Sequence, residues 1–447
     1  MSTQAENQTS TEYAPAPTAR VVVPGARRYV ALTLALALVA LAAVMGFNFV
    51  VDPLQVYRQA FYPPHFSVNQ RYQNPGLARN YTEPLIIIGT SHTENWLPAD
   101  AEAAFGKPAL KLSVAGSGLF EQGRLTDLAI ETGRVERVLW GVDHGATLWL
   151  DEPTDEFGRF PHFLYGPLWR SVVPYLVSID TLSRSIEAIT EPPARGLAEL
   201  NAWYDSVEFG RDRLEHAWEQ MGLRWDDELY AFYQARVPRW HTVEQLMEDQ
   251  MRSRIAASPE VDFDLVFMPY SVYEYVNDFR VDHERFFQRL LLKRQVSDWA
   301  RSHDNLAVWD FQTRREWVFD ASRYSDLAHF NLETSQAMLD DIAEADTPWP
   351  VASSRIQVEM VVEKMDALCT LEDEEAREHW CPTRVWCGRA RLHHWLAGGA
   401  DPGQLLDAAW LKCAGEPKHR QRRREEERDS SLPVQPRPAA PGTPEPG

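Results

Sequence analysis

The sequence predicts an α/β domain, a three-layer sandwich in which helices flank a central parallel sheet. Two observations predict this fold class. Short, continuous apolar runs recur along the chain, and such runs are typical of strands that are buried on both faces of a parallel sheet. Stretches of helical character separate these runs, as alternating βα units require.

The predicted strands and helices alternate between residues 84 and 345. The first apolar run, Pro-Leu-Ile-Ile-Ile-Gly, covers residues 84–89. The other predicted strands are 135–142, 263–268 and 306–311, and a further short strand precedes Gly116. The predicted helices are 99–105, 119–131, 283–301 and 332–345.

The composition is that of a globular protein with an acidic surface. Hydrophobic residues make up 44% of the 447 residues and charged residues 25%, so the chain can bury a sizeable core in two or three structural units. The formal net charge of −20 argues against a nucleic-acid binder, because neutralising phosphates requires clustered Lys and Arg. The G-x-x-x-x-G-K pattern does not occur, so ATP use is not expected, and no cofactor is predicted.

An uncharged apolar stretch near the N-terminus predicts one membrane-spanning helix. Residues 1–28 are largely polar and are expected to be disordered in the cytoplasm. The run 29–51 follows two arginines, and about 20 apolar residues are enough for a helix to cross the hydrocarbon core. Because the basic residues precede this run, the positive-inside rule places everything after Asp52 outside. The expected location is therefore the cytoplasmic (inner) membrane, single-pass, with a periplasmic or extracytoplasmic main domain.

Two alternatives to a spanning anchor remain open. Ala40 and Ala42 offer an A-x-A site, so the run could be a cleaved signal peptide, although it is long and starts late. It could also be a buried core helix, although no charge or amide interrupts its middle. No second span follows in the sequence, so a multi-helix channel or transporter is not expected.

Residues 52–347 are predicted to form the main domain, and one part of it departs from the βα alternation. About 150–259 is helix-prone and rich in Trp, and it looks like an insertion over one edge of the sheet. These aromatic side chains could stack on a sugar, or they could pack the insertion's own core. They are Trp169, Trp203, Trp218, Trp225 and Trp240.

A small Cys-containing region, 348–417, is expected after the main domain, followed by a disordered Pro-rich tail, 418–447. One amphipathic helix, 358–368, precedes the cysteines. Four cysteines outside the cytoplasm could form two disulfides, but the sequence does not fix their pairing. The zinc alternative lacks a tight C-x-x-C pair, so no metal is predicted. Its ligands would be Cys381, Cys387, His393 and His394, which would have to converge. The other two cysteines of the chain are Cys369 and Cys413.

Three short blocks place polar residues or glycine after predicted strands. In Gly89-Thr-Ser-His, Ser91 follows the first strand at its carboxyl end, the edge where open α/β sheets bind ligands. In Lys111-Leu-Ser-Val-Ala-Gly, Gly116 can bring a backbone N–H close to an oxygen that gains negative charge. In Leu139-Trp-Gly-Val-Asp-His-Gly, Asp143 or His144 could reach the same edge. Each block alone is also compatible with an ordinary turn or helix cap.

The fourth block, Ser325-Asp-Leu-Ala-His-Phe-Asn, lies after the last predicted strand and before the terminal helix. Asp326 and His329 are three residues apart, so on a single turn the carboxylate can reach one imidazole nitrogen. That hydrogen bond would fix the tautomer and leave the other nitrogen to take a proton from Ser91. A helix cap beside a surface His is the alternative for an isolated D-x-x-H.

In this order, the blocks resemble those of the SGNH (GDSL-like) hydrolase superfamily over roughly 81–345. Gly89-Thr-Ser-His stands where that family has Gly-Asp-Ser-Leu, and Asp143 stands where it usually has an Asn. The resemblance implies a triad of Ser91 as nucleophile with Asp326 and His329. It also implies an oxyanion hole built from the N–H groups of Ser91 and Gly116, with Asp143 as a further candidate.

By the same resemblance, the expected activity is that of a serine esterase or O-acyltransferase. Membrane-anchored SGNH domains resemble enzymes that O-acetylate or de-acetylate cell-wall and secreted polysaccharides, and the D-alanyl transfer proteins. The implied partners are a polysaccharide or other acylated envelope substrate, the membrane through one helix, and proteins of the envelope. One alternative is a binding or scaffold module that has lost its chemistry. A general lipid esterase, with Leu119 and Phe120 beside a greasy pocket, is another.

Overall fold

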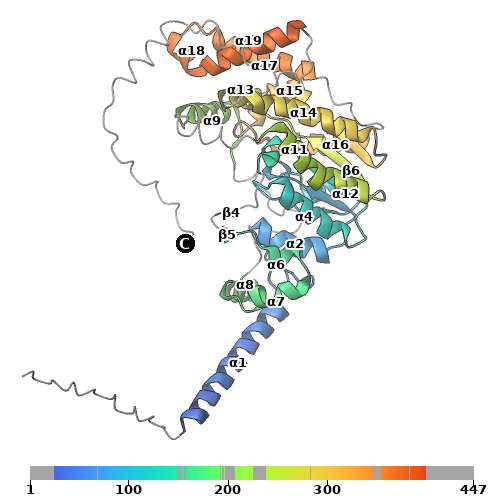
Figure 1. The fold of residues 1–447 in the computed structure, drawn as a ribbon, viewed down its shortest axis with the longest axis vertical. Coiled ribbons are helices and arrows are strands. Elements are labelled where there is room, and N and C mark those ends of the chain that lie inside the picture. The colour runs from blue at the N-terminus through green and yellow to red at the C-terminus, as the bar shows by residue number, and fades with distance from the viewer. Residues whose placement is uncertain are drawn as a thin grey trace, which may run out of the picture.

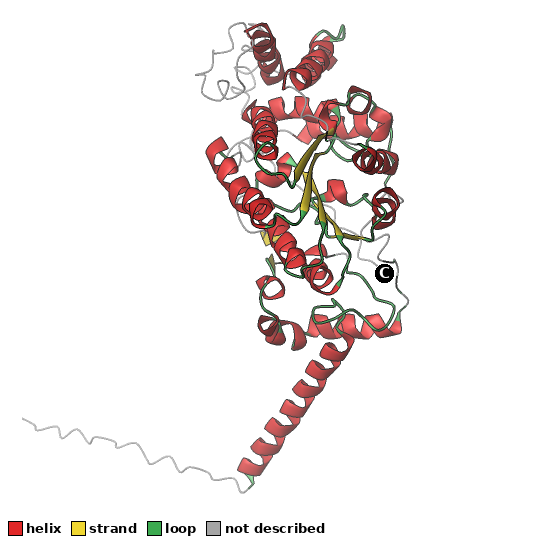
Figure 2. Cartoon of the chain, turned by 90° about the vertical axis from the view of Figure 1, so that its right-hand side faces the viewer, coloured by secondary structure: helices red, strands yellow, loops and turns green. Residues whose placement is uncertain are grey.

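Five parallel strands form the centre of the protein, whose computed structural model describes residues 25–149, 154–155, 158–191, 193, 196, 207–224, 238–345, 348 and 354–398, apart from 68, 282 and 382. Within these ranges the strands pair in the order β2-β1-β3-β6-β7, and every neighbouring pair is parallel. Helices lie on either side of the sheet in Figure 2. The predicted α/β class with a parallel sheet is therefore confirmed. The strands are β1 (Leu85–Ile88), β2 (Ala109–Lys111), β3 (Arg137–Val142), β6 (Asp262–Phe267) and β7 (Leu306–Asp310).

The chain order of the strands reverses at β1. Ile86 pairs with Leu110 of β2 on one side and with Val138 of β3 on the other. The chain therefore moves outward from β1 to one edge and returns to the opposite side of β1 before continuing to β6 and β7. In open α/β sheets, ligands bind outside the carboxyl ends of the strands at such a switch point.

Alternate residues of each strand enter two separate hydrophobic cores. Leu85 and Ile87 belong to one core, and Ile86 and Ile88 to the other, as the two-residue period of a strand requires. Residues from α14 contribute to both cores. The first core includes residues of α3 (Pro98–Phe105), α13 (Val272–Val281), α14 (His283–Ala300) and α16 (Leu332–Glu344). The second includes residues of α2 (Gln70–Asn80), α4 (Leu119–Ile130), α11 (Trp240–Met247), η4 (Glu248–Arg252) and α12 (Ser253–Ala257).

The remaining elements of the domain lie between these strands and helices in the chain. They are η1 (Ser91–Thr93), α5 (His144–Thr147), β4 (Thr154–Asp155), β5 (Gly158–Arg159), α6 (His162–Tyr165), η2 (Leu168–Arg170), α7 (Val172–Leu176), α8 (Ile179–Thr190), α9 (Arg211–Arg224), η5 (Phe311–Thr313), α15 (Arg315–Val318) and η6 (Ala321–Arg323).

The N-terminal apolar run forms α1 (Ala26–Val51), which projects from the rest of the protein (Figure 1). Among the described residues it is the one helix that is long and apolar enough to cross a membrane, and none of its most apolar window is buried. The alternative of a buried core helix is therefore wrong. Only the last turns of α1 enter the domain, where the Asn48 amide donates to the Leu176 carbonyl and accepts from the Ser185 hydroxyl.

The segment expected as one insertion at about 150–259 is spread over several parts of the protein. Helices α7 and α8 pack against α1, and α9 packs against η6. The helices from Trp240 onward instead pack on the face of the sheet that forms the second core, because their apolar residues enter that core. Trp218 is buried and stacks on Trp380, whereas Trp169 is 70% exposed. Trp203 and Trp225 lie outside the described residues.

The C-terminal helices share the first core. They are α17 (Ser354–Cys369), α18 (Glu374–Trp380) and α19 (Thr383–Gly398), and apolar residues of α17 and α19 join that core. Cys369 and Cys381 form a disulfide, so Cys381 is not available as a thiolate ligand and the zinc alternative is wrong. Residues 1–24 of the expected disordered segment 1–28, together with Cys413 and the tail 418–447, lie outside the described residues. Residues 26–28 begin α1 instead, so the prediction of disorder is wrong for them.

Candidate active site

The site lies at the carboxyl end of β1, where four segments, which follow β1, β2, β3 and β7, meet. Ser91 opens η1 immediately after β1, and Asp143 follows β3. The Gly116 loop follows β2, and its Val114 N–H donates to the Gly89 carbonyl at 2.9 Å. The loop that carries Asp326 and His329 lies after β7, between η6 and α16. The switch point of the sheet therefore brings together the blocks that the sequence predicts to carry chemistry.

Ser91, His329 and Asp326 form a continuous hydrogen-bonded chain. The Ser91 Oγ lies 2.7 Å from His329 Nε2, and His329 Nδ1 lies 2.8 Å from Asp326 Oδ2. All three residues are half-buried, so their hydrogen bonds are partly shielded from water. This arrangement lets the imidazole accept a proton from the serine while the carboxylate fixes its orientation.

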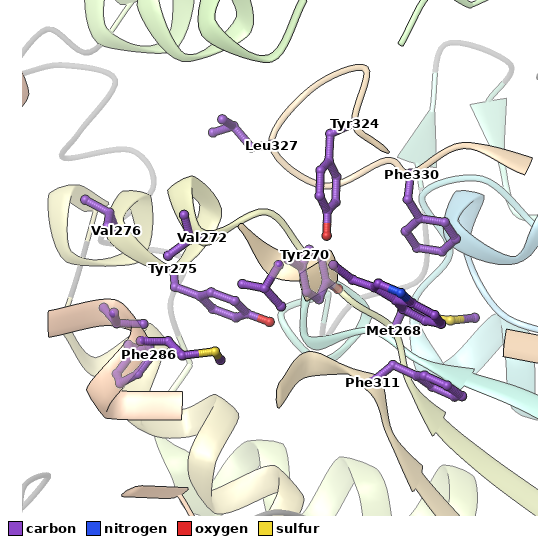
Figure 3. Close-up of a cluster of buried hydrophobic side chains, with 14 of the residues drawn as sticks. Met268, Tyr270, Val272, Tyr275, Val276, Phe286, Phe311, Tyr324, Leu327 and Phe330 are labelled. Atoms are coloured by element: carbon purple, nitrogen blue, oxygen red, sulfur yellow. The ribbon is translucent and has the colours of Figure 1, made fainter. Parts of the chain in front are cut away.

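The loop that carries Asp326 and His329 is held rigidly by its own backbone. Asp326 Oδ1 accepts from the backbone N–H groups of Ala328 and His329, each at 2.8 Å. The bridge between Tyr324 and Phe330 closes the loop, and both aromatic rings point into the apolar cluster around Tyr270 (Figure 3). The loop therefore holds the Asp–His pair in position without help from a substrate.

The carboxylate and the imidazole stabilise each other's charged forms. Burial alone would raise the pKa of Asp326, but the hydrogen bond and charge of His329, with the two backbone N–H groups, lower it to about 2. Burial alone would lower the pKa of His329, but the hydrogen bond and charge of Asp326 outweigh it and raise that pKa. Asp326 is therefore ionised at neutral pH, and His329 is a stronger base than an ordinary histidine.

A close backbone approach before Ser91 explains the glycine of the first block. A Cβ atom at Gly89 would lie 2.7 Å from both Cγ2 and Oγ1 of Thr93, which is too close for any real contact. Thr93 in turn donates to the Thr90 carbonyl and is 2.6 Å from the Ser113 hydroxyl. Glycine at this position lets η1 turn back over the end of β1, and this turn places Ser91 at the edge of the sheet.

The loop after β2 leaves open space beside Gly116. Gly116 has φ +62° and is exposed, and a Cβ there would meet nothing within 4 Å. Neighbouring groups hold the loop: Gln70 accepts from the Ala115 N–H at 2.6 Å, and the Arg71 guanidinium reaches the Gly116 carbonyl at 3.4 Å. The predicted contribution of the Ser91 and Gly116 N–H groups to an oxyanion hole stays a prediction.

Asp143 reaches the site, but as a carboxylate that accepts hydrogen bonds from several donors. Its two oxygens accept from the Thr90 hydroxyl at 3.0 Å, the Tyr270 hydroxyl at 2.5 Å and the Gly145 N–H at 2.8 Å. Burial raises the pKa of Asp143, but the charge of His92 and these hydrogen bonds outweigh it and hold that pKa far below its ordinary value. An ionised carboxylate has no hydrogen to donate, so Asp143 could serve an oxyanion hole only in its protonated form, and its part in such a hole stays a prediction.

His92 connects Asp143 to the triad, and sequence reasoning assigned it no role. Its Nδ1 lies 3.2 Å from Asp143 Oδ2, and its ring stacks on that of His329 with centroids 4.9 Å apart and planes 13° from parallel. Its place directly after Ser91 was the available signal. Tyr270 had no such signal, because it lies on the loop after β6 and reaches Asp143 only through the fold.

Two other histidines named from the sequence, His144 and His393, have surroundings of their own away from the triad. His144 is buried beside Arg289, and this burial lowers its pKa well below the ordinary value. His393 lies in α19, where its Nε2 is 3.0 Å from the Asp366 carboxylate. Comparisons of the chain with protein-family models, curated proteins and solved structures find no match.

Proposed function

We propose that this protein is a membrane-anchored serine esterase or O-acyltransferase of the SGNH type, which acts on an acylated envelope or secreted polysaccharide. The observation that carries the proposal is the hydrogen-bonded chain from Ser91 Oγ through His329 to Asp326. The chain lies at the switch point of a parallel sheet, where α/β proteins bind ligands. Helices on both sides of the sheet and the order of the motif blocks agree with a three-layer SGNH-like sandwich.

In the proposed reaction, an acyl group passes through an ester on Ser91. His329 Nε2 accepts the hydroxyl proton as Ser91 Oγ bonds to the carbonyl carbon of the acyl donor, and the carbonyl oxygen becomes an oxyanion. The oxyanion collapses, and the donor oxygen leaves with the proton from His329. His329 Nε2 then accepts the proton of a sugar hydroxyl or a water as its oxygen bonds to the acyl carbon, and His329 returns that proton to Ser91 Oγ as the acyl–serine bond breaks. Asp326 accepts the hydrogen bond from the Nδ1–H of His329 throughout the reaction.

An exposed tryptophan beside the Gly116 loop supports a sugar substrate. Trp149 is 56% exposed, and its Cβ lies 3.2 Å from the position a Cβ would take at Gly118. An open indole face next to a loop of the site can stack on a pyranose ring, whereas a buried one cannot. The open space at Gly116 then accommodates the ester on that sugar.

The proposed location is the outer face of the cytoplasmic membrane, with the N-terminus in the cytoplasm. Basic Arg27 and Arg28 precede the apolar part of α1, which agrees with that orientation. The Cys369–Cys381 disulfide also supports it, because disulfides persist in oxidising compartments.

The test is turnover of 4-nitrophenyl acetate by the full chain in detergent micelles, with and without an oligosaccharide acceptor. We expect release of nitrophenol that Ser91→Ala abolishes and that the exposed-site control Ser322→Ala leaves unchanged. Acceleration by the acceptor would identify a transferase, and Trp149→Ala should remove that acceleration while Trp169→Ala should not. A rate that is the same in wild type and Ser91→Ala would overturn the proposal.

A binding or scaffold module without catalysis is the second candidate, and Asp143 favours it. Its ionised carboxylate stands where the resembled family has an Asn donor, and negative charge near the site opposes an oxyanion. This candidate predicts no nitrophenol release, together with polysaccharide binding that Trp149→Ala weakens.

A further inference from the structure

Helix α8 carries an apolar strip with no covering element among the described residues. Ile179 is 83% exposed, Ile186 48% and Ile189 55%. At 100° per residue these three side chains fall within an arc of about 80° on the helix. The buried positions of α8 are instead the small residues Thr181, Ser185 and Ala188. The usual pattern of a surface helix, with its apolar side inward, is thus reversed.

The contacts of α8 fix which way the strip faces. The Ser185 hydroxyl donates to Asn48 of α1, so the small-residue side rests against the anchor helix. Arg184 lies on the side opposite the strip, and its Nη1 donates to the Ser67 hydroxyl, which belongs to the segment that leads into the domain. The strip therefore faces away from the domain, toward the exposed apolar part of α1. Figure 1 shows α7 and α8 at the base of the domain, beside the upper end of α1.

The level of α8 along α1 coincides with the expected surface of the bilayer. From Tyr29 to Asn48 the helix rises about 29 Å, which is about the thickness of a hydrocarbon core. Asn48 and Asp52, at the end of this stretch, carry polar side chains that hydrocarbon excludes, and both satisfy their polar groups within the domain. Because α8 contacts α1 at Asn48, its apolar strip is at the depth where acyl chains meet the headgroups.

We propose that α8 is an interfacial helix that inserts Ile179, Ile186 and Ile189 among the lipids of the same membrane that α1 spans. This inference rests on the proposed anchor and goes beyond it. One spanning helix leaves a domain free to tilt, whereas a second contact at an angle to the first fixes the orientation of the domain. The active site is then held in one direction relative to the membrane surface. Interfacial helices of this kind bury their apolar face about 5–10 Å into the headgroup–acyl boundary.

The test is the depth of nitroxide spin labels on the full chain, reconstituted into vesicles of phosphatidylethanolamine with a minority of phosphatidylglycerol. Single labels are placed through Ile186→Cys on the strip and Glu187→Cys, an exposed neighbour about 100° away on the helix. Leu36→Cys reports the anchor, and unsubstituted protein gives the labelling background of the native cysteines. Accessibility to dissolved oxygen, which prefers lipid, is compared with accessibility to a water-soluble nickel chelate.

The expected result is an Ile186 label about 5–10 Å below the headgroup boundary, with the Glu187 label in water and the Leu36 label deep in the bilayer. If the Leu36 label is deep but the Ile186 and Glu187 labels are both in water, the interfacial helix is overturned and the anchor stands. A hydrated Leu36 label would overturn both. An Ile186 label shielded from oxygen and nickel alike would assign the strip to a protein partner and overturn lipid docking.

Discussion

Replacing Asp326 by Asn separates the geometry of the candidate triad from its chemistry. In the structure, Asp326 Oδ1 accepts two backbone N–H groups at 2.8 Å, and Oδ2 accepts from His329 Nδ1. The amide oxygen of Asn would keep the two backbone bonds, so its NH₂ group would face Nδ1. His329 must then present a bare Nδ1 and carry its proton on Nε2, which faces Ser91. A protonated Nε2 cannot accept the serine proton.

The expected loss in the Asp326→Asn variant is therefore large, while the fold is preserved. A wrong tautomer in such a triad lowers the rate about 10⁴-fold, which corresponds to about 5.5 kcal/mol of transition-state stabilisation. The assay is the rate at which a fluorophosphonate probe labels the full chain. Asp320→Asn is the matched control, because Asp320 caps η6 just before the same loop. A labelling rate in Asp326→Asn within tenfold of wild type would refute the reasoning.

Three further predictions concern pH, packing and the disulfide. The pKa of His329 is raised above its ordinary 6.5, and only the neutral imidazole activates Ser91. The rate of fluorophosphonate labelling should therefore rise with pH through a midpoint above 6.5, and a midpoint below 6.5 would contradict this. Gly89→Ala should lower the free energy of unfolding by about 1–3 kcal/mol in denaturant titrations, because its Cβ would collide with Thr93, and an unchanged value would remove the packing argument. Replacing Cys369 and Cys381 together by Ser should cost about 2–3 kcal/mol in the same titration, because the bond closes a 12-residue separation.

Sequence patterns were sufficient for the strands, the main helices and the members of the candidate triad. The four-residue strand β1 is entirely apolar and β-branched or Leu, so its burial on both faces is evident from sequence. Carboxyl ends of parallel strands meet at one edge, which is why the order of the blocks predicted that Ser91 and the Asp326–His329 pair would meet. The D-x-x-H spacing predicted the Asp–His hydrogen bond, because both groups lie on one turn.

Other contacts between distant segments, among residues outside the motif blocks and around Asp143, could not be predicted from those patterns. Tyr270 and His92 surround Asp143 only after β1, β3 and β6 have paired side by side. The helices from Trp240 to Ala257 were expected within an insertion, because their sequence does not reveal that they cover the sheet. The apolar strip of α8 would ordinarily be read as a buried face, and only its packing against α1 shows that it points outward.

The most direct test of the central claim is the position of the fluorophosphonate adduct on the full chain, mapped by peptide mass spectrometry. The proposed triad predicts a single adduct on the Ser91 oxygen, which lies 2.7 Å from His329 Nε2. The adduct should disappear in the His329→Ala variant and persist in the Ser322→Ala variant. A folded protein that takes no adduct, or one that is labelled on another serine equally well in His329→Ala, would contradict the serine-hydrolase account.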